Sequence, residues 1–376
     1  MGKTARAAPF AVTARMNRDE GKEKRDMKRR IVVAGMMVIT GILGVMLAGP
    51  ASEAPAQDVI KIKVADGLPA GHVQVVEGLA PFMKEVEART KGRVKFTHYT
   101  SGQLGKQNDM LELLKSGVAD MAYIGPSYFA GKMPLSGVFE LPQAYPSSAV
   151  GSEAYWQLSV KGILAKEEWG KHNVYPVLAM AYAPYEIFNS KKLGRVPADF
   201  KGMKIRTAGG TQDLTARAFG AVSIFKTPQE LYESAQRGVV DGALFPVEAI
   251  ASYKLQEVFK FATRGADVTG FVMAYAVNGK TWNSLPEDIK KIFLDVGLEQ
   301  TRKFGKAADR LSNDYYAQYE KAGMKVATLT PAERVAWAQV TAPVEKQWVD
   351  NLEKRGLPGK RVLAEYKKYM SSLKKK

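Results

Sequence analysis

The sequence of 376 residues contains no cysteine and only three histidines, His72, His98 and His172. Without cysteine the fold cannot use disulfides, and thiol catalysis and thiolate metal sites are excluded. Three scattered histidines leave little material for a histidine metal site or a catalytic triad. The nucleophile elbow, the phosphate-binding loop, the dinucleotide fingerprint and the zinc-binding helix motif are also missing. These absences argue against an enzyme and predict neither a cofactor nor a metal site.

Long apolar runs are also scarce, and the one clear example lies near the N-terminus. Ile31 to Leu47 is almost uncharged and follows a basic segment. Ala54-Pro55-Ala56 behind it matches an A-x-A cleavage site. Residues 1–56 are therefore predicted to be a secretory signal peptide cut near Ala56, with residues 1–26 a candidate start-site extension, which places the mature protein in the periplasm. A retained membrane anchor is the alternative, because the run approaches spanning length.

The charge is strongly positive, with a formal net charge of +17. Such an excess can indicate nucleic acid or an acidic membrane surface. The lysines are scattered, however, and gather only in the tail at Lys367-Lys368 and Lys374 to Lys376. No aromatic and basic stripe is interleaved, so a solvated basic surface is predicted and nucleic acid is not expected as a partner.

Strand-like and helix-like segments alternate after residue 57. Period-two alternation predicts strands, and apolar spacing of three and four predicts helices. The expected order is a strand at Ile60–Val64, a helix at Val75–Thr90 with a kink at Pro81, a strand at Arg93–Tyr99, a helix at Gln107–Ser116 and a strand at Ala119–Ile124. This order predicts an α/β fold with a largely parallel sheet, and the length suggests two domains.

An internal echo supports two similar lobes. The segments LLKSGVADMAYIGP and ESAQRGVVDGALFPVEA share a helix end, Gly-Val-x-Asp, a short apolar strand and a proline. Their aspartates, Asp120 and Asp241, are interpreted as structural. Each echo delivers a loop at the carboxyl end of a strand, where open α/β sheets bind ligands. Chance similarity of so short a motif is the alternative.

Arg206 is the strongest single candidate for a binding residue. It ends a predicted strand from Lys204 and precedes Gly209-Gly210 and a helical run that begins near Thr211. A guanidinium beside a helix N-terminus offers a planar fork of donors that suits a carboxylate. On this local pattern alone, an ordinary surface arginine in an ion pair is the alternative.

Several blocks together resemble the DctP-type periplasmic solute-binding proteins of TRAP (tripartite ATP-independent periplasmic) transporters. The blocks are SGQLGKQNDMLELLKSGVADM, Glu140 to Pro142, DFKGMKIR ending at Arg206, Phe219 to Ala221, LYESAQRGVVDG and Val277 to Pro286. The resemblance covers Ile60 to Lys291. It implies a two-lobed periplasmic-binding-protein-like α/β fold with a ligand cleft between the lobes, a TRAP permease as membrane partner, and Arg206 at the position of the family's carboxylate-clamping arginine.

The resemblance also predicts how the chain divides between the lobes. Lobe I is expected from residues 57–183 and 272–311, and lobe II from residues 184–271 and 312–376. A pattern without internal proline from Pro286 to about Gly323 predicts one helix about 50 Å long, enough to span both lobes. The protein is predicted to be a monomer.

Two departures from the family pattern bear on the ligand. Many members carry a second arginine near the position of Tyr185, and many carry asparagine where this chain has Phe245. Both changes favour a monocarboxylate with an apolar or aromatic body, with a 2-hydroxy or 2-oxo acid as a further option. The predicted ligand-binding residues are Arg206, His72, Tyr123, Tyr182, Tyr185, Phe245, Glu248 and Phe271; Tyr128, Phe129 and Tyr275 are further candidate walls.

Structural roles are the alternatives for these residues: core packing for each aromatic, an exposed position at a helix start for His72, and interaction with a helix dipole for Glu248. The predicted function is capture of the carboxylate without chemistry and delivery to the permease. A receptor that docks on a sensor protein, and a periplasmic enzyme on the same fold, are the alternative functions.

Overall fold

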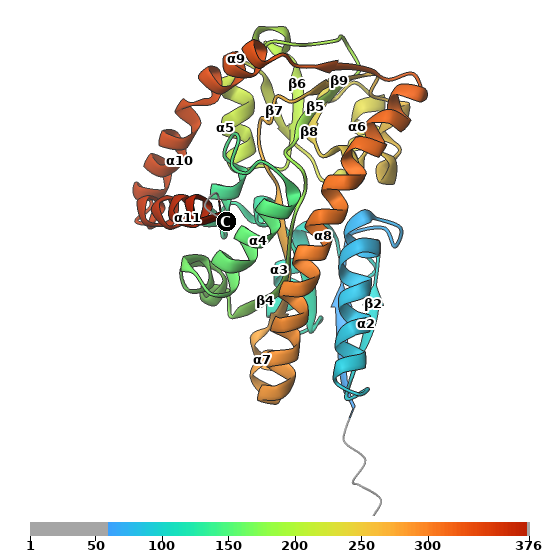
Figure 1. The fold of residues 1–376 in the computed structure, drawn as a ribbon, viewed down its shortest axis with the longest axis vertical. Helices are drawn as coiled ribbons and strands as arrows, with labels where there is room; N and C mark the ends of the chain where they lie inside the picture. The colour runs from blue at the N-terminus through green and yellow to red at the C-terminus, as the bar shows by residue number, and fades with distance from the viewer. Residues whose placement is uncertain (1–58, 374–376) are drawn as a thin grey trace, which may run out of the picture. The chain divides into compact units, whose positions relative to one another are not determined.

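The computed structural model describes residues 59–373, and the predicted signal peptide lies outside these residues. The described residues form two mixed β-sheets flanked by helices (Figure 1). The two-lobed α/β fold is thereby confirmed. Within residues 59–373, no helix combines the length and the apolar character needed to cross a membrane.

The first lobe is built on a five-stranded sheet with the order β2-β1-β3-β10-β4. β1 pairs in parallel with β2 and β3, whereas β10 runs antiparallel to β3 and β4. In β1 the side chains of Ile62 and Val64 are buried, whereas Lys61 and Lys63, which alternate with them, are exposed, as the pattern predicts. The strands are β1 Ile60–Ala65, β2 Val94–Tyr99, β3 Met121–Ile124, β4 Val174–Ala181 and β10 Val272–Asn278.

The second lobe is built on a six-stranded sheet with the order β11-β9-β5-β8-β6-β7. Its strands are β5 Glu186–Asn189, β6 Lys204–Thr207, β7 Val222–Phe225, β8 Gly242–Phe245, β9 Phe261–Arg264 and β11 Lys325–Thr328. β6 lies between β7 and β8 and is parallel to both, so the strand that carries Arg206 is internal to the sheet.

Helices cover the two sheets, and their order follows the predicted alternation. The helix predicted from Val75 begins with a π turn at Val75–Leu79 and continues as α2, with Pro81 in the first turn of the α-helical part. A π turn accommodates the missing N–H of proline. The α-helices are α2 Ala80–Arg89, α3 Met110–Lys115, α4 Ser148–Val160, α5 Thr211–Ala218, α6 Pro228–Gln236, α7 Gly279–Ser284, α8 Glu287–Lys321, α9 Pro331–Thr341, α10 Pro343–Glu353 and α11 Gly359–Leu373.

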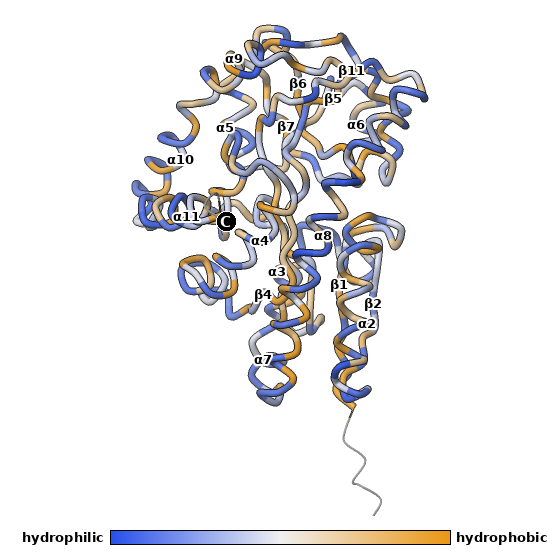
Figure 2. Tube along the Cα trace, in the orientation of Figure 1, coloured by the Kyte–Doolittle hydropathy of each residue, from blue (hydrophilic) through white to orange (hydrophobic). Residues whose placement is uncertain are grey.

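The first three connections between the lobes along the chain are two extended segments and one helix. The extended segments are residues 182–185 from β4 to β5 and residues 265–271 from β9 to β10, and they meet in an antiparallel bridge between Tyr185 and Thr269. The third is the 35-residue helix α8, which packs on α2, α4 and β4 of the first lobe and on β11 of the second. Figure 2 shows hydrophilic and hydrophobic residues interspersed along α8. The predicted helix spanning both lobes is confirmed.

Asp120 and Asp241, the aspartates of the repeated motif, make equivalent hydrogen bonds in the two sheets. The backbone N–H of Lys63 on β1 donates to Asp120 (2.9 Å), and the backbone N–H of Lys204 on β6 donates to Asp241 (2.9 Å). Each aspartate thus holds the strand next to its own, directly before β3 or β8 begins. The structural interpretation of both residues is confirmed, and β6 is fixed in register at its start.

The C-terminal helices return from the second lobe toward the first. α9 contributes Trp337 to the core around Phe200 and Phe219, whereas α10 and α11 contribute Trp348 and Tyr366 to the hydrophobic cluster of α4 and β4. This packing departs from the predicted division, in which all of residues 312–376 belong to lobe II. The exact lobe boundaries remain a prediction.

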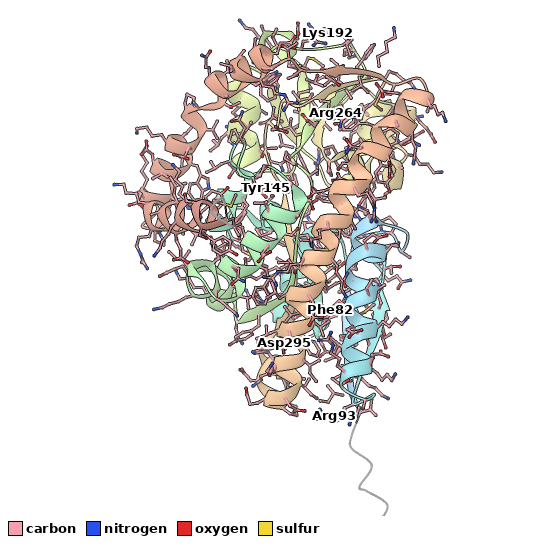
Figure 3. All side chains as sticks on the ribbon, viewed as in Figure 1. Phe82, Arg93, Tyr145, Lys192, Arg264 and Asp295 are labelled. Carbon is pink, nitrogen blue, oxygen red and sulfur yellow. The ribbon has the colours of Figure 1, made fainter. Side chains whose placement is uncertain are left out.

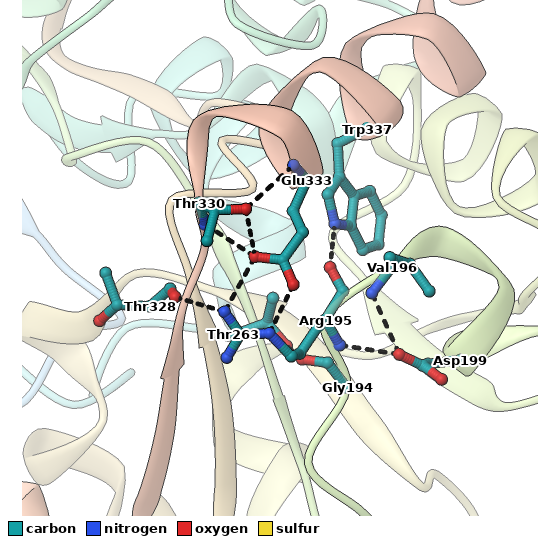
Figure 4. Close-up of polar contacts among 9 residues, drawn as sticks. All are labelled: Gly194, Arg195, Val196, Asp199, Thr263, Thr328, Thr330, Glu333 and Trp337. Carbon is teal, nitrogen blue, oxygen red and sulfur yellow. Dashed lines mark hydrogen bonds and ion pairs between the residues drawn. The ribbon is translucent and has the colours of Figure 1, made fainter.

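A polar network ties α9 to the loop that precedes β6 (Figure 4). Arg195 forms an ion pair with Glu333 on α9, and the indole N–H of Trp337 donates to the carbonyl of Arg195 (2.8 Å). Asp199 accepts hydrogen bonds from the backbone N–H groups of Arg195 and Val196. These contacts fix the segment of residues 195–199, which leads into β6 and Arg206.

Candidate ligand-binding site

Arg206 is buried at the end of β6, with a side chain that is only partly satisfied. Only 1% of the surface of Arg206 is exposed to solvent. Nε donates to the carbonyl of Lys226 (2.7 Å) and Nη1 to the carbonyl of Leu244 (3.3 Å), at the ends of the neighbouring strands. Nη2 is buried and has no hydrogen-bond partner among the described residues. A buried cation with an open donor is costly unless an anion pairs with it.

The turn after β6 is built from glycine for conformational reasons. Gly209 and Gly210 have φ of +94° and +59°, values that residues with a Cβ rarely adopt. Gly210 is the N-cap of α5 and provides no side-chain cap. Thr211 Oγ1 donates to the carbonyl of Gly137 in the first lobe (3.1 Å). The helix start beside Arg206 is thus tied to the opposite lobe.

An aromatic ring of β8 lies beside the guanidinium, and rings from both crossover segments pack behind it. The Arg206 guanidinium lies 5.2 Å from the ring centroid of Phe245. Tyr185 stacks on Phe271 with ring centroids 5.8 Å apart and an interplanar angle of 4°, and Phe271 also contacts Tyr182 at 6.0 Å. Four predicted wall residues, Tyr182, Tyr185, Phe245 and Phe271, are therefore brought together.

Tyr145, which is labelled in Figure 3, fixes the backbone of Phe271 from the first lobe. Its hydroxyl accepts from the backbone N–H of Phe271 (3.0 Å) and donates to the carbonyl of the same residue (3.3 Å). Tyr128 packs against the ring of Phe271 at 5.4 Å. Burial raises the pKa of Tyr128 to about 12, and the charge of Arg206 and a hydrogen-bonding interaction of its guanidinium with the Tyr128 hydroxyl oppose this shift. The Tyr128 hydroxyl therefore belongs to the surroundings of the arginine.

The other candidate walls differ in position. Tyr123 and Tyr275 are buried edge to face at 5.8 Å, and the Tyr275 hydroxyl donates to the buried Asp66. Burial raises the pKa of Tyr123, and neighbouring tyrosines, Tyr128 first among them, raise it further, so Tyr123 also lies among the wall residues. Phe129 packs in the core cluster with Leu135 instead.

His72 is fully buried, not exposed at a helix start. Its Nδ1 accepts from the backbone N–H of Gln74 (3.2 Å), and its Nε2 lies 3.1 Å from the Tyr182 hydroxyl. Burial lowers the pKa of His72 to about 3. The imidazole is therefore neutral at physiological pH and acts as a hydrogen-bonding group.

Glu248 joins two connections between the lobes, the first crossover segment and helix α8. Its Oε1 accepts from the backbone N–H of Ala183 (3.2 Å) in the first crossover segment and from Ser312 Oγ on α8 (2.8 Å). Burial raises the pKa of Glu248 to about 7. These contacts give Glu248 a structural role at the junction, and its contact with a ligand remains a prediction.

Gln74 and Tyr253 belong to the same surroundings and were not predicted. Gln74 is fully buried and accepts from the Tyr182 hydroxyl (3.0 Å), and Tyr253 packs against His72 and Phe245 with centroids 5.8 and 6.0 Å apart. The position of Gln74, two residues after His72, was the only signal in the sequence. Tyr253 follows the second echo by several residues and carried no signal.

A hollow of about 680 Å³ lies between the lobes beside this site. Gly67, Lys106 and Gln107 line it from the first lobe, and Lys226 and Gln229 from the second. The amide of Gln229 donates to the carbonyl of Gly67 (2.8 Å) across it. Lys226, whose carbonyl accepts from Arg206 Nε, lines the hollow, whereas Arg206 itself does not. Within residues 59–373, no cluster of three or more acidic or histidine side chains could hold a metal ion.

Two lobes joined by crossover segments, with a buried arginine and aromatic rings between them, define a binding protein of the periplasmic two-lobed class. Residues 65–351 match the family described as bacterial extracellular solute-binding protein, family 7 (DctP). The chain belongs to this family, the DctP-type periplasmic solute-binding proteins of TRAP transporters. Its members bind small carboxylates and work with membrane permease subunits.

Relatives and solved structures agree with this assignment. The C4-dicarboxylate-binding periplasmic protein DctP of Rhodobacter capsulatus is 27% identical over 343 residues, 87% of this chain and 96% of the relative. A TRAP solute-binding protein from Bordetella bronchiseptica with bound mandelate is 25% identical, with a TM-score of 0.75 over 84% of this chain and 99% of that one. A Rhodoferax ferrireducens homologue in complex with benzoate is 22% identical, with a TM-score of 0.78 and the same coverage, and supports the fold.

Proposed function

We propose that this protein captures an organic monocarboxylate with an apolar or aromatic body outside the cytoplasmic membrane and delivers it unchanged to a TRAP permease. The observation that carries the proposal is the buried Arg206, whose Nη2 has no partner among the described residues. A carboxylate oxygen is the partner that best suits a guanidinium donor in a water-poor site. The protein acts as a monomer, after cleavage of residues 1–56.

The surroundings of Arg206 favour one carboxylate over two. Tyr185, Phe245 and Phe271 form the wall beside the guanidinium, and the crossover position of the family's frequent second arginine is occupied by Tyr185. A second carboxylate would be buried without a matching cation, which is unfavourable. The mandelate-bound homologue supports an aromatic monocarboxylate, whereas the Rhodobacter relative is named for dicarboxylates.

Capture depends on contacts that exist only when the lobes are together. Gln229 to Gly67 and Thr211 to Gly137 are hydrogen bonds between the lobes, and Gln212 Nε2 donates to the carbonyl of Gly270 in the crossover segment (3.1 Å). A ligand held by Arg206 and by rings of the crossover segments stabilises this arrangement. Ligand binding shifts the equilibrium by its preference for the closed state. The permease would then recognise the closed form.

A thermal-shift screen of residues 57–376 tests the function. Aromatic and aliphatic monocarboxylates, dicarboxylates, sugars and amino acids are compared in the wild type, in Arg206→Ala and in Arg217→Ala, an exposed arginine on α5. A ligand at a hundred times its Kd adds about 2.7 kcal/mol. Monocarboxylates are expected to stabilise the wild type and Arg217→Ala but not Arg206→Ala. Stabilisation by sugars alone, or equal shifts in all three proteins, would contradict the proposal.

A further inference from the structure

His72, Tyr182 and Gln74 form a directional chain of hydrogen bonds. Because His72 Nδ1 accepts from the backbone N–H of Gln74 (3.2 Å), the hydrogen of the neutral ring is on Nε2. Nε2 therefore donates to the Tyr182 hydroxyl (3.1 Å), which in turn donates to Gln74 Oε1 (3.0 Å). The chain begins at a backbone amide and ends at a side-chain amide.

This direction fixes the orientation of the Gln74 amide. If its oxygen and nitrogen were exchanged, Tyr182 would receive two donors, and its own hydrogen would have no acceptor in the chain. With the oxygen toward Tyr182, every hydrogen of the chain has an acceptor. Gln74 Nε2 is then left buried with two donor hydrogens and no partner among the described residues. A buried donor without a partner costs about 1–3 kcal/mol, so the position favours a ligand acceptor.

A continuous row of aromatic rings, the lining, connects Arg206 at one end with the Gln74 amide at the other. From the guanidinium the rings run through Phe245 and Tyr253 to His72, with successive separations of 5.2, 6.0 and 5.8 Å. Along the other side, Tyr185 connects Phe245 to Tyr182 at 6.3 and 6.0 Å. The Tyr253 hydroxyl is also buried without a partner. The Gln74 amide thus lies at the end of the lining away from the cation, and the Tyr253 hydroxyl lies between that end and Arg206.

We propose that Gln74 Nε2 is a specificity-determining donor, and that the preferred ligand is a monocarboxylate with a neutral oxygen substituent, a hydroxyl or a carbonyl, at the end remote from its carboxylate. The proposal rests on the proposed function and narrows its substrate class. A hydroxyl oxygen would accept from Gln74, and the Tyr253 oxygen is available for its hydrogen. A second carboxylate fits poorly, because the neighbouring groups are a neutral imidazole, an amide and the buried Asp66.

The test compares ligand pairs that differ by one hydroxyl. Benzoate, phenylacetate and their meta- and para-hydroxy derivatives are titrated calorimetrically into the wild type, Gln74→Met and Tyr182→Phe. At least one hydroxy acid is expected to bind the wild type about tenfold or more tightly than its parent. Gln74→Met should reduce this advantage to about twofold or less while the parent acid keeps its Kd within about threefold. Tyr182→Phe should reduce it in the same direction, because the amide loses the group that orients it.

Gln300→Met is the matched control, since Gln300 is a buried glutamine whose amide donates to the carbonyl of Glu77 and not to the lining. It should keep the full advantage of the hydroxy acid. Equal affinity of every hydroxy acid and its parent in the wild type would overturn the inference, as would an advantage that survives in Tyr182→Phe and in a folded Gln74→Met. In both cases the monocarboxylate function would stand, whereas failure of all the acids to bind while another solute class binds would refute the proposed function itself.

Discussion

Two of the three guanidinium nitrogens of Arg206 are held by the carbonyl groups of Lys226 and Leu244, and only Nη2 is open. The backbone therefore leaves the Nη2 amino group, which carries two N–H donors, buried and without a hydrogen-bond partner among the described residues. His72 is also fixed by hydrogen bonds: its Nδ1 is bonded to Gln74 and its Nε2 to Tyr182. At the residue scale, the site consists of groups whose protonation and direction are set before a ligand arrives.

The neutral state of His72 predicts a specific pH dependence of stability. Burial lowers its pKa from 6.5 to about 3. Between these values the unfolded chain binds a proton that the folded protein does not, so the free energy of unfolding falls as the pH drops. Each proton contributes at most about 1.4 kcal/mol per pH unit. The contribution of the neutral His72 to the free energy of unfolding is complete above pH 6.5 and is lost progressively as the pH falls below 6.5.

Urea unfolding of the ligand-free wild type and of His72→Asn at several pH values measures this dependence. Asparagine can still accept at the position of Nδ1 but does not titrate. The free energy of unfolding should fall less steeply between pH 6.5 and 4.5 in the variant. Other groups titrate alike in both proteins, so equal slopes would show that His72 is protonated in the folded state.

Much of the site could not be read from the sequence, for physical reasons. Arg206 was found because a strand end, a glycine turn and a helix start are local signals, and the family resemblance strengthened them. Gln74 was missed because its orientation depends on Tyr182, which is 108 residues away. Glu248 is predicted to contact the ligand, and its hydrogen-bond partners in the structure, Ala183 and Ser312, come from distant segments. Hydrogen bonds between residues far apart in the chain produce no periodic pattern in the sequence.

At the scale of elements, the predictions that used periodicity were the most successful. The strands at β1 and β3 and the helix α8 appear within a few residues of their expected ends. The destination of α10 and α11 was not predicted, because an amphipathic helix shows that it has a partner without showing which one. The exact contacts of α8 with α4 likewise depend on glycines whose packing role only the structure shows.

Gly305 in α8 gives an element-scale prediction that opposes helix propensity. A Cβ built on it would lie 2.5 Å from the Cα of Ala149 at the start of α4. Propensity alone predicts that Gly305→Ala stabilises the protein by up to about 1 kcal/mol. The close approach predicts instead a loss of about 1–3 kcal/mol, because backbone would have to move.

The exposed neighbour Lys306 provides the control, and Lys306→Ala should change the free energy of unfolding by about 0.5 kcal/mol or less. Chemical denaturation of the two variants and the wild type decides between the two expectations. A more stable Gly305→Ala would mean that α8 and α4 do not approach this closely.

At the scale of the whole molecule, ligand capture is an equilibrium between open and closed lobes. The Gln229 amide donates to the carbonyl of Gly67 across the hollow. Gln229→Ala removes this hydrogen bond, which is worth about 0.5–1.5 kcal/mol. We expect the ligand found in the screen to bind about two- to tenfold more weakly, mainly through faster dissociation.

Stopped-flow measurement of dissociation rates tests this expectation, with Gln236→Ala as control. Gln236 is exposed at the other end of the same helix, α6, and should leave the rate unchanged. An unaltered dissociation rate in Gln229→Ala would mean that the bond does not help to hold the lobes together.

The most direct test of the central claim is a calorimetric cycle on Arg206. The monocarboxylate that binds best is titrated beside its neutral primary amide, into the wild type and into Arg206→Ala. If Arg206 Nη2 receives the carboxylate, the wild type should prefer the acid by about a hundredfold or more, and the variant should bind acid and amide about equally. Retention of the full preference for the acid in a folded Arg206→Ala would contradict the account, because the carboxylate would then be bound elsewhere.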